Sequence, residues 1–310
     1  MGLRDEQWGV IVNPYSGKRE LQKDWVRIYR LLKYAEIRFF EQMTAYPGHA
    51  VEIARSLVDS GVRHILVVGG DGTMNEVVNG IFTSSLPDKS SVSLALIPYG
   101  TGNDWARFWG LADKGHNLSS RLFERRKVKV DVGRVRYRHD GKMCERYFIN
   151  DASVGLSAAV VKTTNRLKKY LGGRGWVYTL SLLVYVCLYR SVRMKVVAGD
   201  SSIEKEMFTV TVGNGCYTGG GIKQTPAAVP YDGLFQINAI ERPTFIRILE
   251  GLRFLFRGEI DKHPCAHIYV SDNVHIGASA ALLAETDGIM LPEATDYAID
   301  IIPSAIGMCV

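Results

Sequence analysis

The sequence contains no long hydrophobic run. Its longest apolar stretch, WVYTLSLLVYVCLY at 176–189, is shorter than the roughly 20 residues that a membrane-spanning helix needs. The first residues, MGLRDEQWGVIVNP, carry charges where a secretory signal has an apolar core. We therefore expect a cytoplasmic protein in which 176–189 forms a buried helix.

Cysteine is scarce and scattered. The five cysteines, at positions 144, 187, 216, 265 and 309, are odd in number and lack the spacing of metal ligands. The histidines do not cluster at ligand spacing either. These absences exclude a disulfide framework and a cysteine-based zinc site, and they indicate free thiols in a reducing compartment.

Composition and charge are those of an ordinary globular protein. The 310 residues suffice for two domains with at least one sizeable core. Apolar residues make up 46% of the chain and charged residues 23%, which excludes a disordered chain. The net charge of +6 is compatible with an anionic partner, such as a nucleotide or an acidic membrane surface. No nucleic-acid partner is expected.

The pattern of apolar residues changes near residue 128. Over the first 110 residues, apolar strands such as HILVVGG at 64–70 alternate with segments of helical periodicity, which predicts a parallel sheet covered by helices. Beyond 128, short alternating runs separated by Gly, Asp and Asn are typical of an antiparallel sheet or sandwich, interrupted by helices near 157–190 and 244–257. The sequence therefore predicts an N-terminal α/β nucleotide-binding domain over 1–128 and a C-terminal β-sandwich domain over 129–290.

Three glycine-rich loops follow predicted strands of the first domain. In VVGGDGTMNEVVNG at 67–80, glycines come directly after a buried strand and before a helix. Backbone N–H groups can approach an anion closely there, and the positive end of the helix dipole points toward it. IPYGTGNDWAR at 97–107 and NPYSGK at 13–18 are further junctions of this kind. Because ligands bind at the carboxyl ends of parallel strands, we expect the three loops to form one phosphate site.

A plainer alternative exists for each loop taken alone. A short motif such as GGDGT is equally compatible with a tight turn and an N-capping Asp or Thr. The pattern also differs from two common phosphate loops: no G-x-x-x-x-G-K-[ST] occurs, and GGDGTMNE lacks the G-x-G-x-x-G spacing. The phosphate site is favoured because three such loops would share one edge of the sheet.

Three segments of the first domain resemble, in their order and intervals, the catalytic domain of the diacylglycerol kinase family. They are NPYSG, GGDGTMNEVVNG and PYGTGNDWAR, and the resemblance is to bacterial soluble lipid kinases related to sphingosine kinases in particular. FINDASVGLSAAV at 148–160 and GNGCYTGGGIKQTPAAVPYDGLFQI at 213–237 are similar to motifs of that family's second domain. The resemblance implies Mg²⁺-dependent transfer of the γ-phosphate of ATP to a hydroxyl of diacylglycerol or a similar lipid. It also implies that the last strand returns to the first domain, so that 291–310 belong with 1–128.

The resemblance also assigns residues to the site. It implies that the three loops and MTAYPGHA bind the nucleotide, and that one carboxylate with nearby main-chain oxygens holds a structural Mg²⁺. The implied nucleotide contacts are Asn13, Pro14, Tyr15, Ser16, Gly17, Thr44, Gly69, Gly70, Asp71, Gly72, Thr73, Asn75, Glu76, Gly100 and Thr101. The implied metal ligands are Asp232 in YDGL, Val229 and Leu234.

The match to the family fails at the catalytic base. Where the family carries DGE, this sequence has Asp287-Gly288-Ile289. Ile289 cannot accept a proton. Either Asp287 serves alone, or Glu285, one strand period away on the same face, takes over, or the protein is a poor kinase. We expect Asp287 to be the base, with Glu285 as its helper.

The segment PTFIRILEGLRFLFRGEI at 243–260 bears on where the protein acts. At helical spacing its apolar side chains form one stripe, and Arg247, Arg253 and Arg257 share the other face with Ile246 and Phe254. An ordinary surface helix explains most of this pattern. Arginines among exposed apolar side chains are also typical of a helix on an anionic membrane, and further basic residues stand at 166, 168, 169 and 174. We expect peripheral contact with an anionic membrane.

Two other functions stay open on the sequence. NAD kinases share the GGDG loop, although NPYSGK, NEVVNG and NGCYTGGG together resemble the lipid branch. A sensor that binds ATP or lipid without turnover would account for Ile289. The identity of the acceptor lipid is open as well, and so is a homodimer.

Overall fold

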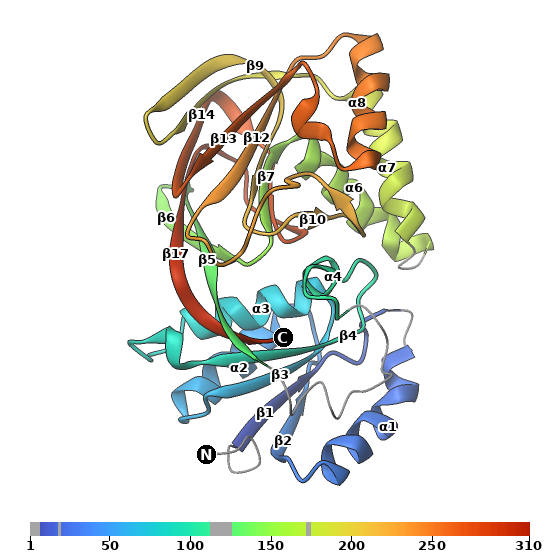
Figure 1. Ribbon diagram of the computed structural model, residues 1–310, viewed down its shortest axis with the longest axis vertical. Helices are drawn as coiled ribbons and strands as arrows, with labels where there is room; N and C mark the ends of the chain where they lie inside the picture. Colours follow the sequence, from blue (N-terminus) through green and yellow to red (C-terminus); the bar gives the residue numbers. More distant parts are fainter. Residues whose placement is uncertain (1–6, 18–19, 112–125, 172–174) are drawn as a thin grey trace. The chain divides into compact units, whose positions relative to one another are not determined.

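Two strands carry the chain between two units of the structure. The computed structural model describes residues 7–17, 20–111, 126–171 and 175–310. It divides into an N-terminal unit, Met1–Val130 with Ser304–Val310, and a C-terminal unit, Asp131–Pro303. Strand β5 (Lys127–His139) spans the first boundary and β17 (Ala294–Cys309) spans the second (Figure 1). The return to the N-terminal unit begins later in the chain than the predicted boundary at 291.

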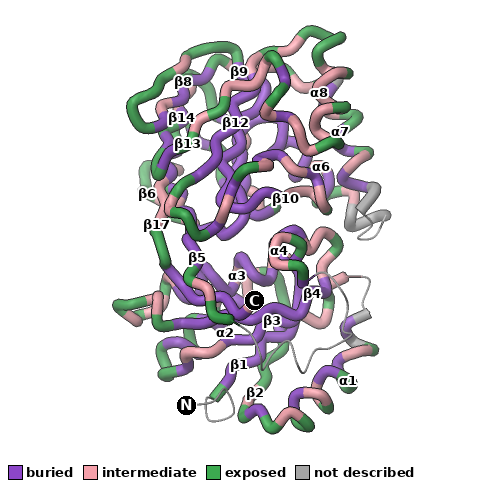
Figure 2. Tube along the Cα trace, viewed as in Figure 1, coloured by how far each residue is buried: buried purple, intermediate pink, exposed green. Residues whose placement is uncertain are grey.

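The N-terminal unit is built on a parallel sheet, as predicted. Its other strands are β1 (Gln7–Val12), β2 (Arg38–Met43), β3 (His64–Gly69) and β4 (Ser93–Pro98). They lie in the order β2-β1-β3-β4-β17, and each neighbouring pair is parallel. Strands β3 and β4 are apolar and buried along nearly their whole length (Figure 2), as expected of strands covered on both faces.

Helices pack on both faces of this sheet. They are α1 (Glu20–Tyr34), α2 (His49–Asp59), α3 (Asp71–Phe82) and α4 (Asp104–Phe108), with a 3-10 turn η1 at Lys89–Ser91. Trp25 and Leu32 of α1 share one hydrophobic core with Val10 of β1. The next residue back, Gly9, points to the other face, where a Cβ atom would lie 2.6 Å from the side chain of Leu57 in α2.

The C-terminal unit is antiparallel, as predicted. Its remaining strands are β6 (Lys142–Phe148), β7 (Asp151–Gly155), β8 (Val192–Ala198), β9 (Ser201–Gly213), β10 (Tyr217–Thr218), β11 (Ile222–Lys223), β12 (Phe235–Glu241), β13 (Ala266–Ser271), β14 (Asn273–Leu282), β15 (Ala284–Thr286) and β16 (Ile289–Met290). Strands β16-β15-β7-β9-β8-β14-β17 are neighbours in this order. Off this path, β12 pairs with β9 and β13, and β5 pairs with β17 and β6.

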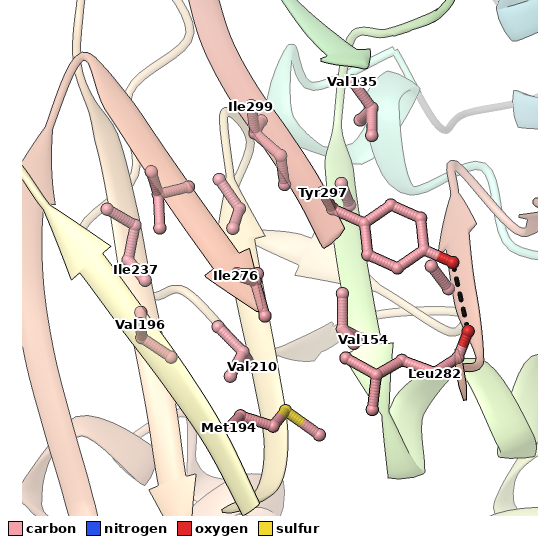
Figure 3. Close-up of a cluster of buried hydrophobic side chains, with 14 of the residues drawn as sticks. Val135, Val154, Met194, Val196, Val210, Ile237, Ile276, Leu282, Tyr297 and Ile299 are labelled. Carbon is pink, nitrogen blue, oxygen red and sulfur yellow. Dashed lines mark hydrogen bonds between the residues drawn. The ribbon is translucent and has the colours of Figure 1, made fainter. Parts of the chain in front are cut away.

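One hydrophobic core lies among these strands (Figure 3). Val154, Met194, Ile276 and Tyr297, from four different strands, belong to it. Tyr297 is fully buried, and its hydroxyl donates a hydrogen bond to the carbonyl oxygen of Leu282 at 3.0 Å. The polar end of the ring is therefore satisfied inside an apolar core.

Three helices of the C-terminal unit pack on a second hydrophobic core. They are α6 (Leu156–Leu171), α7 (Gly175–Leu188) and α8 (Phe245–Arg257), and a 3-10 turn η2 lies nearby at Ile260–Lys262. Val160 of α6 and Leu182 of α7 belong to this core, and the partly buried Leu252 of α8 packs against it.

The expectation that 176–189 forms a buried helix is right about the helix and wrong about one of its faces. Helix α7 contacts α6 and α8, which cover only part of its surface. Leu180, Leu183, Val184 and Leu188 remain 42–69% exposed. None of the helices in the described ranges is both long enough and apolar enough to cross a membrane.

Candidate active site

The three glycine-rich loops follow strands that are close together in the sheet. The loop at 13–17 follows β1, the loop at 69–73 follows β3, and the loop at 99–103 follows β4. Because β1 lies between β2 and β3, the order of the strands reverses direction between β1 and β3. In open α/β sheets, ligands bind outside the carboxyl ends of the strands at such a switch point.

Direct contacts join these loops to one another. The side-chain amide Nδ2 of Asn13 donates to the hydroxyl Oγ1 of Thr73 at 2.9 Å. A Cβ atom built on Gly70 would lie 2.6 Å from the Cα atom of Gly100. The structure thus brings together the loops that the sequence analysis singled out, and it does so through positions where a larger side chain has no room.

The loop at 13–17 also meets the loop after β4. Gly17 adopts φ +61°, and a Cβ atom on it would lie 2.7 Å from the carbonyl oxygen of Tyr99. The N–H of Tyr99 donates to the carbonyl oxygen of Gly69 at 2.8 Å. Residues from all three loops therefore pack within one small region at the edge of the sheet.

The loop at 69–73 leads directly into helix α3. Its N-cap residue is Gly70, which has no side chain to accept a hydrogen bond from the first turn. A Cβ atom on Gly72 would meet nothing within 4 Å, so the backbone there faces open space. The N–H groups of a first helical turn carry the positive end of the helix dipole. A phosphate group can therefore approach this backbone closely.

Two of the predicted nucleotide contacts cap other helices. Oδ1 of Asp71 accepts a hydrogen bond from the N–H of Trp105 at 3.1 Å, at the start of α4. Burial raises the pKa of Asp71, and nearby backbone N–H groups partly offset this effect. The carboxylate oxygens of Glu76 accept from the N–H groups of Gly48 at 2.9 Å and Ala50 at 3.3 Å, at the start of α2. Both carboxylates therefore fix the positions of neighbouring helices.

The other predicted nucleotide contacts differ in exposure. Thr44 and Asn75 are buried, and Oδ1 of Asn75 accepts from Nδ2 of Asn79 at 3.1 Å within α3. Tyr15 is largely exposed. The remaining three, half-buried or exposed, are Pro14, Ser16 and Thr101.

An aromatic pair follows β2 at the same edge of the sheet. The rings of Tyr46 and His49 are stacked, with centroids 4.5 Å apart and 14° between their planes. The hydroxyl of Tyr46 donates to Oε2 of Glu52 at 2.9 Å, and Nδ1 of His49 accepts from the N–H of Ala45 at 3.0 Å. Tyr46 is nevertheless 50% exposed. It is an ordered aromatic ring with a large surface open to solvent.

In the C-terminal unit, Asp287 anchors a turn. With Gly288 it forms the two-residue connection between β15 and β16, and both residues have positive φ, 47° and 80°. Oδ2 of Asp287 accepts from the N–H of Ile149 at 3.0 Å, and Oδ1 accepts from Asn150 at 2.9 Å and Asp151 at 3.0 Å. Three backbone donors thus hold this buried carboxylate and tie the turn to the segment before β7.

Glu285 lies two residues earlier, on β15, and is only 2% exposed. Its Oε1 accepts a hydrogen bond from the hydroxyl of Ser153 on β7, and its Oε2 accepts from the N–H of Gly288 at 2.7 Å. Burial, and to a lesser degree the charge of Asp287, raises the pKa of Glu285 to about 7. A carboxyl group with a pKa near neutrality is suited to take up and release a proton.

The predicted metal ligands lie in the loop at 229–234. Oδ1 of the exposed Asp232 accepts a hydrogen bond from the N–H of Leu234 at 3.0 Å. In the same loop, the N–H of Gly233 donates to Oδ2 of the buried Asp131 at 2.7 Å. One carboxylate with the carbonyl oxygens of Val229 and Leu234 makes an all-oxygen donor set, which fits Mg²⁺ that keeps several waters. Among the residues that the structure describes, no group of three or more His, Cys, Asp or Glu side chains could hold a metal.

Comparison with protein families covers most of the chain. The family model of the diacylglycerol kinase catalytic domain matches residues 7–135, and that of the YegS C-terminal NAD kinase beta sandwich-like domain matches residues 150–310. The chain belongs to the diacylglycerol kinase family. It is a kinase in which an α/β domain with a parallel sheet precedes a β-sandwich-like domain, and the fold class predicted from the sequence is confirmed.

Individual relatives of this kinase are similar over most of their length. The chain is 30% identical over 255 residues to YtlR of Bacillus subtilis, whose name is that of a lipid kinase, covering 77% of this chain and 79% of the relative. It is 28% identical over 281 residues to a diacylglycerol kinase of Staphylococcus saprophyticus, covering 90% and 87%.

Solved structures share the fold of this kinase. A crystal structure of a diacylglycerol kinase from Bacillus anthracis has a TM-score of 0.72 at 22% identity, covering 98% of this chain and 96% of that one. The structure of yeast NADH kinase with NADH has a TM-score of 0.53 at 9% identity, covering 98% and 83%. At these identities the likeness concerns the fold alone.

Sequence reasoning missed three residues, one in the N-terminal unit and two in the C-terminal unit, that hold candidate residues or loops in place. Asn103 adopts φ 53°, and its Oδ1 accepts from the N–H of Gly100 at 2.7 Å. Its place in GTGND was a signal, because Asn tolerates the left-handed region. Asp131 gave no clear signal, because in KVKVDV it shares the polar positions of the alternation with Lys127 and Lys129. Ser153 gave none, since its partner Glu285 is remote in the sequence.

Proposed function

We propose that this protein is an ATP-dependent lipid kinase, which transfers the γ-phosphate of ATP to a hydroxyl of diacylglycerol or a similar lipid with the help of Mg²⁺. The observation that carries the proposal is the first turn of α3, which is capped by Gly70 and opens at the switch point of the sheet. The relatives named as lipid and diacylglycerol kinases support a lipid acceptor.

In this proposal the triphosphate binds at the start of α3 and the adenine stacks on Tyr46. Neighbouring strands of a sheet are about 4.8 Å apart, so the ends of β3 and β2, two strands apart, are separated by about 10 Å. Such a span suits a nucleotide with its phosphates at one end and its base at the other. Asp71 and Glu76 contribute by fixing neighbouring helices. The backbone of 69–73 and the loops at 13–17 and 99–103 line the nucleotide.

The reaction requires a proton acceptor for the lipid hydroxyl. Its oxygen forms a new bond to the γ-phosphorus, the bond to the β-phosphate oxygen breaks, and ADP leaves. We propose that Glu285 accepts the proton, because its pKa of about 7 suits a base at neutral pH. Asp287 then serves to hold the turn, since three N–H groups bind its carboxylate. This assignment reverses the two roles expected from the sequence.

Mg²⁺ bound with ATP would neutralise the charge of the phosphates. The loop at 229–234 would hold a structural ion through Asp232 and the carbonyl oxygens of Val229 and Leu234. The carboxylate of Asp131 helps to hold this loop in place by accepting a hydrogen bond from the N–H of Gly233.

We also propose that α7 and α8 contact an anionic membrane. Leu188 of α7 and Phe245 and Leu249 of α8 are 55–69% exposed on neighbouring helices, and Arg253 and Arg257 are exposed beside them. Exposed apolar residues among arginines favour a surface of anionic lipid.

Not every residue of the expected basic and apolar surface contributes to this contact. Phe254, expected on the exposed face, instead packs its ring against His263 at 5.8 Å. Arg174 lies outside the described residues, as do the side chains of Lys168 and Lys169.

Transfer of labelled phosphate from ATP tests the proposal. The acceptors are diacylglycerol in anionic mixed micelles, other lipid alcohols, and NAD, each with the wild type, Glu285→Gln and Asp287→Asn. Transfer to a lipid that is lost in Glu285→Gln supports the proposal. Transfer to NAD would make the protein an NAD kinase, and ATP binding without transfer to any acceptor would make it a sensor.

A further inference from the structure

Three buried carboxyl groups lie close together in the C-terminal unit. They belong to Asp151 on β7, Glu285 on β15 and Asp287 in the turn after β15. Asp151 is 4% exposed, Glu285 2% and Asp287 8%. Acidic side chains are seldom buried in this way unless they have partners. Glu285 and Asp287 have proposed roles as the base and as the anchor of the turn, whereas Asp151 has no role in the proposed mechanism.

The register of β7 and β15 places Asp151 on the same face of the sheet as Glu285. Glu285 lies directly opposite Ser153. Because side chains alternate along a strand, Asp151 and Ser153 share one face, and Asp151 is a diagonal neighbour of Glu285. Long side chains can span such a diagonal. The carboxyl groups of Asp151 and Glu285 do so, and they are hydrogen-bonded to each other.

A hydrogen bond between two carboxyl groups requires a proton on one of them, because an ionised carboxylate can only accept. The neighbours of Glu285 favour its charged form, since its oxygens accept from the hydroxyl of Ser153 and from the N–H of Gly288. Asp287 accepts three backbone N–H groups, which favours a charge there as well. A third negative charge in this buried region would be repelled by both. The proton of the pair therefore belongs on Asp151.

The other charged groups near this pair are mostly exposed. On the far side of β7, strand β9 places Gly213 beside Asp151. Strand β6 and helix α6 also pack against β15. Of their described charged side chains, only Arg146 is half-buried, and the exposed ones are Lys142, Glu145, Lys162 and Arg166. Solvent screens the exposed charges, so the three carboxyl groups and Arg146 set the protonation of the pair.

We propose that Asp151 is a positioning residue for Glu285: its protonated carboxyl group donates a hydrogen bond to the Glu285 carboxylate and keeps that group ready to accept a proton from the lipid hydroxyl. The catalytic part rests on the proposed function, whereas the protonated state of Asp151 does not. Burial raises the pKa of Glu285 to about 7, and hydrogen bonds from Ser153, Gly288 and Asp151 limit the rise. Without the bond from Asp151 the pKa would rise further, and Glu285 would carry a proton at neutral pH.

The pH dependence of kcat in two variants of matched shape tests this role. Asp151→Asn keeps a donor, because an amide N–H can replace the carboxyl proton, whereas Asp151→Leu has the same branched shape and cannot donate. We expect Asp151→Asn to keep the wild-type midpoint near pH 7. Asp151→Leu should move the midpoint upward by about 1–2 pH units, the usual effect of a hydrogen bond to a charged group. Its kcat should recover at higher pH.

The direction of the shift separates the proposal from two other roles of Asp151. A midpoint that falls in Asp151→Leu would overturn the proposal, because it would mean that Asp151 is ionised and repels the charge of Glu285. A midpoint that is unchanged, or that moves equally in both variants, would also overturn it. In that case a hydrogen-bond donor at position 151 has no effect on Glu285, and Asp151 supports only the fold.

Infrared spectroscopy detects the proton without catalysis, and it covers the case in which Asp151→Leu does not fold. At about pH 8 the exposed carboxyl groups and most of Glu285 are ionised, so the carbonyl stretch of a protonated carboxyl group stands out. The difference spectrum of the wild type and Asp151→Asn should contain this band, and its absence would refute a protonated Asp151. The band in a protein that transfers no phosphate to any acceptor would support the protonated Asp151 and count against the proposed kinase activity.

Discussion

Gly70 and Gly100 meet backbone to backbone, and a Cβ atom on either glycine would lie 2.6 Å from the Cα atom of the other. At this point the backbones of the loops after β3 and β4 can meet directly because neither residue has a side chain. This contact fixes the first turn of α3 relative to the loop that carries Asn103 and Asp104. The geometry of the proposed phosphate site therefore depends on the lack of a side chain at both positions.

Replacing Gly100 by Ala is expected to destabilise the N-terminal unit by about 1–3 kcal/mol, because overpacking drives the two loops apart. Gly72→Ala is the matched variant. Its Cβ atom meets nothing within 4 Å, so we expect no loss of stability, but weaker ATP binding, since the methyl group occupies space that the phosphates need. Thermal unfolding and ATP titration measure the two effects. Unchanged ATP affinity in Gly72→Ala would contradict the proposed phosphate position.

Glu285→Gln is expected to lower kcat roughly 10²–10⁴-fold, the usual effect of removing a general base. The KM for ATP should stay the same. In the wild type, kcat should rise with pH and level off above about 7, because Glu285 must be ionised to accept the proton. The variant should lose this dependence. A pH profile of kcat that is the same in both proteins would show that another group is the base.

Stability provides an independent measure of the same carboxyl group. The pKa of Glu285 in the folded protein, about 7, exceeds its ordinary value of 4.5, so the folded state binds more protons between these pH values. The resulting stabilisation is fully present below about pH 4.5 and is lost as the pH rises through 7. Urea unfolding should therefore show Glu285→Gln gaining stability relative to the wild type between about pH 5 and pH 8. A constant difference would mean that the pKa of Glu285 is not raised.

Asp287→Ala leaves three buried backbone N–H groups without their acceptor, and each such group costs about 1–3 kcal/mol. Asp287→Asn keeps one acceptor oxygen and tolerates the positive φ of the turn. We expect the free energy of unfolding to fall from the wild type to Asn and further to Ala. Urea unfolding measures this order. Full stability of Asp287→Asn together with lost activity would instead return Asp287 to the role of catalytic base.

Tyr46→Ala is expected to raise the KM for ATP about tenfold, since stacking of a base on an aromatic ring contributes about 1–3 kcal/mol. The KM for the lipid should not change. Tyr46→Phe keeps the ring and loses only the hydrogen bond to Glu52, so it should resemble the wild type. Steady-state kinetics in both substrates check this. An unchanged KM for ATP in Tyr46→Ala would place the adenine elsewhere.

Reversing the charges of Arg253 and Arg257 to Glu should weaken binding to anionic liposomes, because each basic residue near such a surface contributes about 1 kcal/mol. The control reverses Arg27 and Arg55, which are exposed on α1 and α2 and change the net charge equally. Co-sedimentation with vesicles containing phosphatidylserine compares the two pairs. Equal losses would indicate a general charge effect rather than docking by α8.

The close packing of the three glycine-rich loops could be predicted from the sequence because their glycines are required by the backbone itself. Gly70 and Gly17 stand where a strand ends and another loop passes within contact distance, and the alternation of strands and helices placed these loops on one edge. The scattered cysteines were also informative, since Cys144, Cys216, Cys265 and Cys309 form no disulfide.

The electrostatic arrangement could not be predicted in the same way. Glu76 caps α2 from 26 and 28 residues away, and Asp287 binds N–H groups more than 130 residues away. Such partners are set by tertiary packing, which leaves no local pattern. The raised pKa of Glu285 likewise follows from its burial among β7, β15 and the turn at 287–288, and motif spacing carries no information about burial.

Strand β17 brings residues 304–310 back to the N-terminal unit, where Gly307 and Met308 pair with Ser93 and Leu94 of β4. On the ribosome, these residues emerge after the whole C-terminal unit has been made. Until then, the edge of β4 that β17 later occupies has no neighbouring strand, and another segment of the chain can pair with it wrongly. A chain cut at the first unit boundary would lack this neighbouring strand, so the sheet of the N-terminal unit is completed only by residues 304–310.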